Sequence, residues 1–173
     1  MKQNKPADKP KSSIPAGVLN HISTLLYIEK EIHRSLRYDT PFSTITFSVF
    51  DLKPKRPVPA GMIRGNDLSQ PIMEHLVNIL RGPDLVGILN KKTIVVMLPM
   101  TNEKNAKIAM NRILRKLHEA PFIINDIPLV VQFAAAVTSC SHEKTQDIQT
   151  YLSAAEGNHN DIIYRLNYMQ DLM

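Results

Sequence analysis

Apolar side chains recur every three or four residues in several stretches of the chain, a spacing that is typical of amphipathic helices. This spacing, with the residues that interrupt it, predicts helices over 17–38, from 67 or 69 to about 80, over about 102–119 and over about 144–156. The apolar face of the first helix comprises Ile22, Leu25, Ile28, Ile32 and Leu36. We expect Asp67 or Ser69 to cap the second helix and Thr101 the third, because their side-chain oxygens can accept hydrogen bonds from the first turn.

Runs of β-branched and apolar residues predict the strands. They cover 42–52, a hairpin of 84–89 and 93–98, and a strand pair of 121–124 and 128–139 that turns at Asn125 and Asp126. The hairpin has almost no polar side chains, so we expect it to be buried on both faces. Between the first strand and the second helix, Pro54, Pro57 and Pro59 exclude a regular helix or a central strand, and we expect a long loop there.

The order of these elements contains a β-α-β-β-α-β unit, which is the ferredoxin-like plan. We therefore predict an α/β (α+β) fold with a central mixed sheet that helices flank on one or both sides. The predicted domain covers 17–157. Residues 1–16, rich in Lys, Pro and Ser, are expected to be a disordered tail or linker. Residues 158–173 form a C-terminal extension, for which a further helix and partial disorder both remain open.

The composition narrows the classes of function. The chain has 173 residues, of which 43% are hydrophobic and 21% charged, and this suits one soluble domain. Its single cysteine, Cys140, excludes an internal disulfide and a cysteine-based zinc site, and favours a cytoplasmic protein. No apolar run approaches the roughly 20 residues of a membrane-spanning helix, so we expect no membrane insertion.

The charge and the histidines point to no further class of ligand. Part of the net charge of +5 lies in residues 1–16, where no aromatic residues alternate with the lysines, so we expect no DNA or RNA partner. The six histidines show no metal-ligand spacing, and we expect no metal site.

Four stretches of the sequence resemble one known family. They are EKEIHRSLRYDTPFSTITF, DLVGILNKKTIVVMLPMT, AKIAMNRILRKL and APFIINDIPLVVQFAAAVTS. Over about 25–140 the chain resembles a GGDEF domain, the domain of diguanylate cyclases. From Phe47 to Arg112 the resemblance needs no insertion or deletion. It implies the nucleotidyl cyclase-like fold of that family and a relation to cyclic di-GMP.

The hairpin turn departs from the family at the positions that cyclases use. The glycine pair, which lets the nucleotide lie against the backbone, corresponds to Asn90 and Lys91. The acidic pair that follows corresponds to Lys92 and Thr93. Side chains therefore stand where the family needs bare backbone, and a lysine stands in place of an acid.

The first strand and the loop after it depart as well. The metal-binding aspartate of the strand corresponds to Val49, whereas Asp51 matches a second, less critical acid. The two positions that contact the substrate guanine correspond to Pro57 and Asn66. Cyclisation needs carboxylates that hold divalent metal over the phosphates. We therefore expect no enzyme activity, no catalytic residues and no cofactor.

One ligand site of the family is retained. Many GGDEF domains have an inhibitory product site, an Arg-x-x-Asp just before the hairpin, which corresponds here to Arg81 and Asp84. A further arginine of that site, on the next helix, corresponds to Arg112. Arginine can donate two hydrogen bonds to guanine or to a phosphate, and aspartate can accept from the guanine N1 and N2 donors. An alternative is that these are ordinary surface charges at a helix end and in a turn.

The sequence therefore leads to two hypotheses. In the first, a degenerate GGDEF domain binds cyclic di-GMP through Arg81, Asp84 and Arg112 and acts as a bacterial signalling effector on an unidentified protein partner. In the second, a nucleotide-free interaction or dimerisation module has kept only the fold, and a homodimer is open in either case. A working cyclase is the remote third alternative.

Overall fold

A computed structural model describes residues 14–59, 69–119, 122–124, 126–141, 147–157 and 163–165 of the chain. In chain order the elements are β1 (Val18–Leu19), α1 (His21–Tyr38), β2 (Phe42–Pro54), α2 (Ser69–Ile79), β3 (Leu85–Asn90), β4 (Thr93–Pro99), α3 (Glu103–Glu119), β5 (Phe122–Ile124), β6 (Ile127–Ser139), α4 (Ile148–Gly157) and β7 (Ile163–Arg165). Within these ranges, no helix is both long and apolar enough to cross a membrane.

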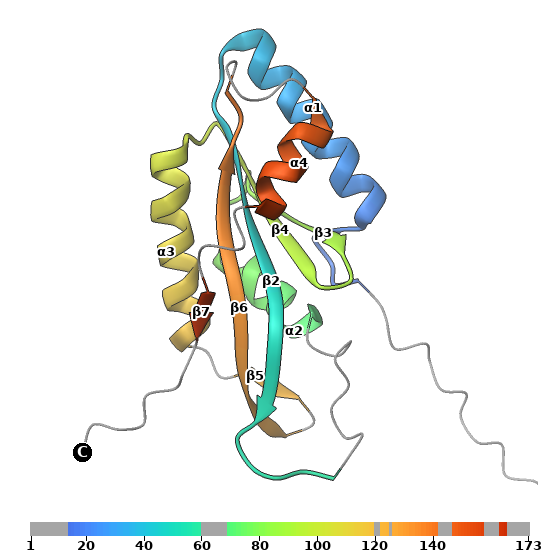
Figure 1. The fold of residues 1–173 in the computed structure, drawn as a ribbon, viewed down its shortest axis with the longest axis vertical. Coiled ribbons are helices and arrows are strands. Elements are labelled where there is room, and N and C mark those ends of the chain that lie inside the picture. Colours follow the sequence, from blue (N-terminus) through green and yellow to red (C-terminus); the bar gives the residue numbers. More distant parts are fainter. Residues whose placement is uncertain are drawn as a thin grey trace, which may run out of the picture.

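All of these strands belong to a single sheet in the order β1-β3-β4-β2-β6-β5, with β7 paired to β6 (Figure 1). The pairs β3–β4, β4–β2 and β2–β6 are antiparallel, whereas the short β1 runs parallel to β3. The elements β2, α2, β3, β4, α3 and β6 form the predicted β-α-β-β-α-β unit. The α/β fold with a central mixed sheet is thus confirmed.

Helices cover both faces of the sheet. Residues of α2 and α3 pack on one face and residues of α1 and α4 on the other, as Figure 1 shows for α3 against α1 and α4. Along β4 the side chains alternate between these two cores: Val96 joins the core of α2 and α3, whereas Val95 and Met97 join the core of α1 and α4. Because both faces are covered, β4 is buried from Thr93 to Leu98. The strand β3 is only partly buried, so the expectation of a hairpin buried on both faces is confirmed for β4 and not for β3.

The strand β2 is longer than predicted, because it continues through Pro54. Its first part pairs with both β4 and β6, but the register with β4 ends at Ser48, and from there to Pro54 only β6 lies beside it. A proline that lacks the N–H donor is tolerated where one side of the strand has no partner. The expected loop therefore begins later, and residues 60–68 of it, with Asn66 and the candidate cap Asp67, lie outside the described ranges.

The first helix begins later than predicted. The segment 17–20 contains β1, and Asn20 caps the helix through a hydrogen bond from Ser23 N to Asn20 Oδ1 of 2.9 Å. Ile22 was expected on the apolar face but is 69% exposed. The buried face instead includes Thr24, two residues further on, and two residues turn a helix by about 200°. At its other end the helix stops at Asp39, in the left-handed conformation with φ 52°, before Pro41, as predicted.

Two further expectations at element ends need correction. Asn102, not Thr101, caps α3: its Oδ1 accepts from Asn105 N at 2.9 Å, while the Thr101 hydroxyl donates to Pro99 O. In the C-terminal extension, Ile163–Arg165 form the strand β7 against β6 rather than a helix, because the β6 edge supplies hydrogen-bonding partners at Gln132–Ala134. Residues 158–162 and 166–173 lie outside the described ranges, as do residues 1–13 of the expected tail.

The helix α1 approaches the sheet closely at Gly87 of β3. A Cβ added there would lie 2.2 Å from Thr24 Oγ1 and 2.8 Å from Thr24 Cγ2 of α1. Thr24 is held in place, since its hydroxyl donates to Asn20 O at 2.8 Å. The absence of a side chain at Gly87 therefore sets how closely α1 can pack on β3.

We predict that Gly87→Ala destabilises the fold by about 1–3 kcal/mol, because the added methyl group forces α1 and β3 apart. Gly82→Ala is the matched control, since a Cβ at Gly82 meets no atom within 4 Å. Urea unfolding followed by circular dichroism measures both variants. Equal stability of the Gly87→Ala and Gly82→Ala proteins would show that the contact with Thr24 does not limit the packing.

Candidate functional site

A tight turn between α2 and β3 holds the two predicted site residues Arg81 and Asp84. The turn is closed twice: Asp84 N donates to Arg81 O at 3.0 Å, and Arg81 N donates to Asp84 Oδ2 at 3.2 Å. Gly82 and Pro83 occupy its corner, and both are exposed. The backbone thus fixes the Asp84 carboxylate at the start of β3 without using the Arg81 guanidinium.

The helix α3 supplies the third predicted residue. Arg112 follows Asn105, Ile108 and Ala109 by seven, four and three residues, so these four side chains share one face of the helix. The adjoining apolar face, which includes Ile113, is buried against α2 and the sheet. Packing of α3 therefore determines where Arg112 lies.

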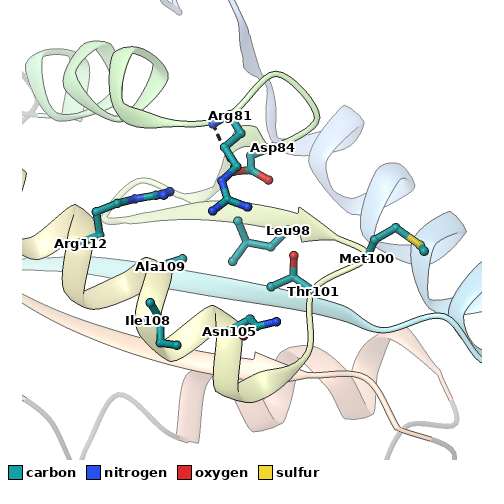
Figure 2. Close-up of a pocket in the computed structure, with 9 residues that line it drawn as sticks. All are labelled: Arg81, Asp84, Leu98, Met100, Thr101, Asn105, Ile108, Ala109 and Arg112. Carbon is teal, nitrogen blue, oxygen red and sulfur yellow. Dashed lines mark hydrogen bonds between the residues drawn. The ribbon is translucent and has the colours of Figure 1, made fainter.

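The three predicted residues lie together at one pocket (Figure 2). The pocket has a volume of about 280 Å³, and its lining comprises Arg81, Asp84, Leu98, Met100, Thr101, Asn105, Ile108, Ala109 and Arg112. In Figure 2 the Arg112 side chain extends from α3 toward the turn that holds Arg81 and Asp84. Asp84 and Arg112 are 28 positions apart in the sequence, and they line the same pocket because α3 packs against α2 and over β2 and β6.

Asp84 and Arg112 can each form hydrogen bonds to a ligand in the pocket. Partial burial raises the pKa of the Asp84 carboxyl, and the Arg81 N–H and the charges of Arg81 and Arg112 offset this only in part. Arg112 Nε is buried and has no hydrogen-bond partner in the described part of the chain. A buried donor without an acceptor costs about 1–3 kcal/mol. A ligand that offers acceptors to the arginines and donors to Asp84 would satisfy these groups together.

The pocket also includes residues that the sequence did not indicate as site residues, above all Met100. Met100 follows β4 in the left-handed conformation, with φ 54°, and is 62% exposed. The next residue is fixed to β2, because Thr101 N donates to Pro41 O at 3.1 Å and Ser43 Oγ donates to Thr101 O at 2.7 Å. For a residue with a side chain this conformation costs about 1–2 kcal/mol. In the sequence, the only indication that sets Met100 apart is its place between Pro99 and the cap of α3, where a long apolar residue is unusual.

The hairpin tip of β3 and β4 shows how the altered turn is built. Asn90, Lys91 and Lys92 are exposed, and Asn90 Oδ1 accepts a hydrogen bond from Lys92 N at 2.9 Å. Thr93 is buried, and its hydroxyl lies 3.1 Å from the Ser48 hydroxyl of β2. Side-chain hydrogen bonds therefore shape a tip whose sequence offers no carboxylate. Among the described residues, no group of three His, Cys, Asp or Glu side chains could hold a metal ion.

Comparisons of sequence find no relatives: no family model matches the chain, and no curated protein does. Comparisons of structure find proteins with a similar fold. The GGDEF domain of FimX from Pseudomonas aeruginosa superposes with a TM-score of 0.67 at 15% identity, over 87% of this chain and 93% of that one. The active GGEEF domain of a diguanylate cyclase from Vibrio cholerae gives a TM-score of 0.61 at 16% identity, over 82% and 88% of the two chains.

A third similar structure is that of a microbial GGDEF domain in a novel mode of interaction with bis-(3,5)-cyclic di-GMP. It superposes with a TM-score of 0.56 at 16% identity, over 80% of this chain and 83% of that one. Each of the three superpositions covers at least 80% of this chain and of the other chain, so the strands and both helical layers are compared over most of their length. This protein therefore has the fold of a GGDEF domain.

Proposed function

We propose that this chain is a catalytically inactive GGDEF-like domain that binds cyclic di-GMP and acts as a receptor for it. The observation that supports this most is the convergence of Arg81, Asp84 and Arg112 on one pocket. The resemblance of the sequence to GGDEF domains indicated these three residues as a set. Two of them come from a turn and one from a helix, and nothing in the local sequence requires them to meet.

The groups in the pocket match the chemistry of a guanine nucleotide. An arginine can donate two hydrogen bonds to guanine O6 and N7 or to a phosphate. Asp84, when ionised, accepts from the guanine N1 and N2 donors. The unpartnered Arg112 Nε is a donor that a ligand acceptor would satisfy. Cyclic di-GMP offers guanine edges and phosphates in one molecule.

The residues at the hairpin favour binding over synthesis. Cyclase chemistry needs carboxylates that hold metal ions over the triphosphate. The tip reads Asn90, Lys91, Lys92, Thr93, and Val49 stands at the position that corresponds to the family's metal-binding aspartate. A lysine near the tip can attract a phosphate but cannot hold a divalent cation.

In this proposal the ligand-bound domain acts on a protein partner, as an effector does. The pocket lies at the surface and opens beside α3, so a partner can contact both the protein and the bound nucleotide. The partner, the pathway and a homodimer of this chain are open. The alternative, a nucleotide-free interaction module, predicts no binding of cyclic di-GMP at all.

The first prediction concerns affinity. Calorimetric titration should detect cyclic di-GMP binding, and Arg81→Ala and Arg112→Ala should each weaken it about tenfold or more, since a bidentate arginine contact contributes about 1–3 kcal/mol. Arg115→Ala is the matched control on α3, because Arg115 is exposed and lies outside the pocket lining. A folded wild-type protein that gives no heat at high ligand concentration would exclude the receptor function. Intact binding by both pocket variants would disprove the site.

The second prediction concerns pH. Burial raises the pKa of Asp84, so this carboxyl takes up a proton at a higher pH than an ordinary aspartate does. A protonated carboxyl cannot accept both guanine hydrogen bonds. Affinity should therefore be constant near neutral pH and fall as the pH is lowered through the raised pKa, at a higher pH than an ordinary aspartate would require. Asp84→Asn should bind weakly with a flat profile. An unchanged wild-type affinity down to the pH at which an ordinary aspartate is protonated would argue against contact between Asp84 and guanine.

The third prediction concerns catalysis. Incubation with GTP and Mg²⁺ should yield no cyclic di-GMP above the level of a protein-free control, because the carboxylates for the metal are missing. Chromatography of the nucleotides measures this. Product that accumulates in proportion to protein concentration would overturn the assignment as inactive.

A further inference from the structure

Met100 is a residue of the pocket with an unusual backbone conformation and an unusual exposure. It adopts the left-handed conformation that favours glycine or asparagine, and it exposes an apolar side chain. The conformation is imposed from outside the residue, because Thr101 is hydrogen-bonded to Pro41 and Ser43 at the start of β2. Strained residues that persist in this way occur preferentially at ligand sites.

Ile108 resembles Met100 in exposure and position. It lies on the outer face of α3, is 60% exposed, and lines the same pocket. In Figure 2 the side chains of Ile108, Asn105, Thr101 and Met100 follow one another along the margin of the pocket that lies across from Arg81 and Asp84. We call these four residues the rim. The rim is apolar at both ends and polar in the middle.

The pocket behind the rim is too small and too sparsely charged for a whole cyclic dinucleotide. Its volume of about 280 Å³ is at the lower end of small-molecule sites, which reach about 1,000 Å³. Among the described residues Asp84 is the only carboxylate in its lining, and one carboxylate can accept hydrogen bonds from the N1 and N2 donors of one guanine. One base with its phosphate can therefore be read inside, and the second base must lie outside.

We propose that the rim binds this second base by apolar contact with Met100 and Ile108 and does not distinguish guanine from adenine at its edge. This inference rests on the proposed binding of cyclic di-GMP. Apolar contact with the face of a base depends little on which base it is, because every base presents a flat π-face. The Asn105 amide carries both donors and an acceptor, so it suits either purine. The site then requires one guanine and accepts guanine or adenine as the second base.

Ligands with different bases test the inference on the wild-type protein. 3′,3′-cyclic GMP–AMP should compete for the site within about fivefold of cyclic di-GMP, of which a factor of about two is statistical, because only one of its bases can enter. Cyclic di-AMP, which has no guanine, should not compete. A loss of about fiftyfold or more for the mixed ligand would show that both guanines are read and would overturn the inference.

A substitution at the rim provides a second, independent test. Met100→Gly should weaken cyclic di-GMP binding about three- to tenfold, because the apolar contact of the methionine side chain with the base is lost. It should also leave the melting temperature unchanged or raise it, since glycine adopts the conformation with φ 54° without strain. Ile123→Ala is the control, because Ile123 is an exposed isoleucine outside the pocket lining. Unchanged affinity of the Met100→Gly protein, or an equal loss in the control, would remove the rim from the site.

The failure of this inference is distinguishable from the failure of the proposed function. If Arg81→Ala abolishes binding while Met100→Gly has no effect, the receptor function stands and the rim does not contribute. If cyclic di-AMP binds as tightly as cyclic di-GMP, the pocket does not read guanine, and both the site assignment and the rim fail.

Discussion

The strand β4 is the element on which the rest of the structure depends. From Ile94 to Leu98 it has no polar side chain, and its side chains alternate between two cores. Apolar surface on both faces of a strand is stable only where helices cover both. The sheet must therefore lie between α2 with α3 and α1 with α4. The same requirement packs α3 against α2 and over β2 and β6, and so brings Arg112 to the turn of Arg81 and Asp84.

The pattern of apolar residues was sufficient to predict the mixed sheet and most of the elements, but it left open whether helices cover one face of the sheet or both. It failed at the ends of elements that depend on hydrogen bonds of polar groups or on pairing between strands. Thr101 and Asn102 are both competent caps, and the hydrogen bonds of Thr101 to β2 leave the cap position to Asn102. Pro54 is part of the strand β2 because the pairing of β2 with β4 stops before this residue, so its missing N–H donor leaves no acceptor of β4 unpaired. Neither fact can be read from local sequence, since each depends on a neighbour distant in the chain.

The candidate site was predictable only in part for a similar reason. Arg81, Asp84 and Arg112 were indicated by the resemblance to GGDEF domains, and the fold brings them to one pocket. Their convergence is a property of how α3 packs, which no local pattern contains. Met100 and Ile108 were missed because each is an ordinary apolar residue in sequence. Only their exposure beside the pocket, and the left-handed backbone of Met100, distinguish them from core residues.

The central claim is that cyclic di-GMP binds at the pocket of Arg81, Asp84 and Arg112, where it supplies an acceptor to the buried Arg112 Nε donor. Nuclear magnetic resonance of the arginine Nε–H groups observes this donor directly. Saturation with cyclic di-GMP should shift the Arg112 Nε–H resonance and slow its exchange with water, because the donor gains an acceptor, while the resonance of the exposed Arg115 stays unchanged. A saturated protein in which the Arg112 resonance and its exchange rate are unaltered would contradict the account.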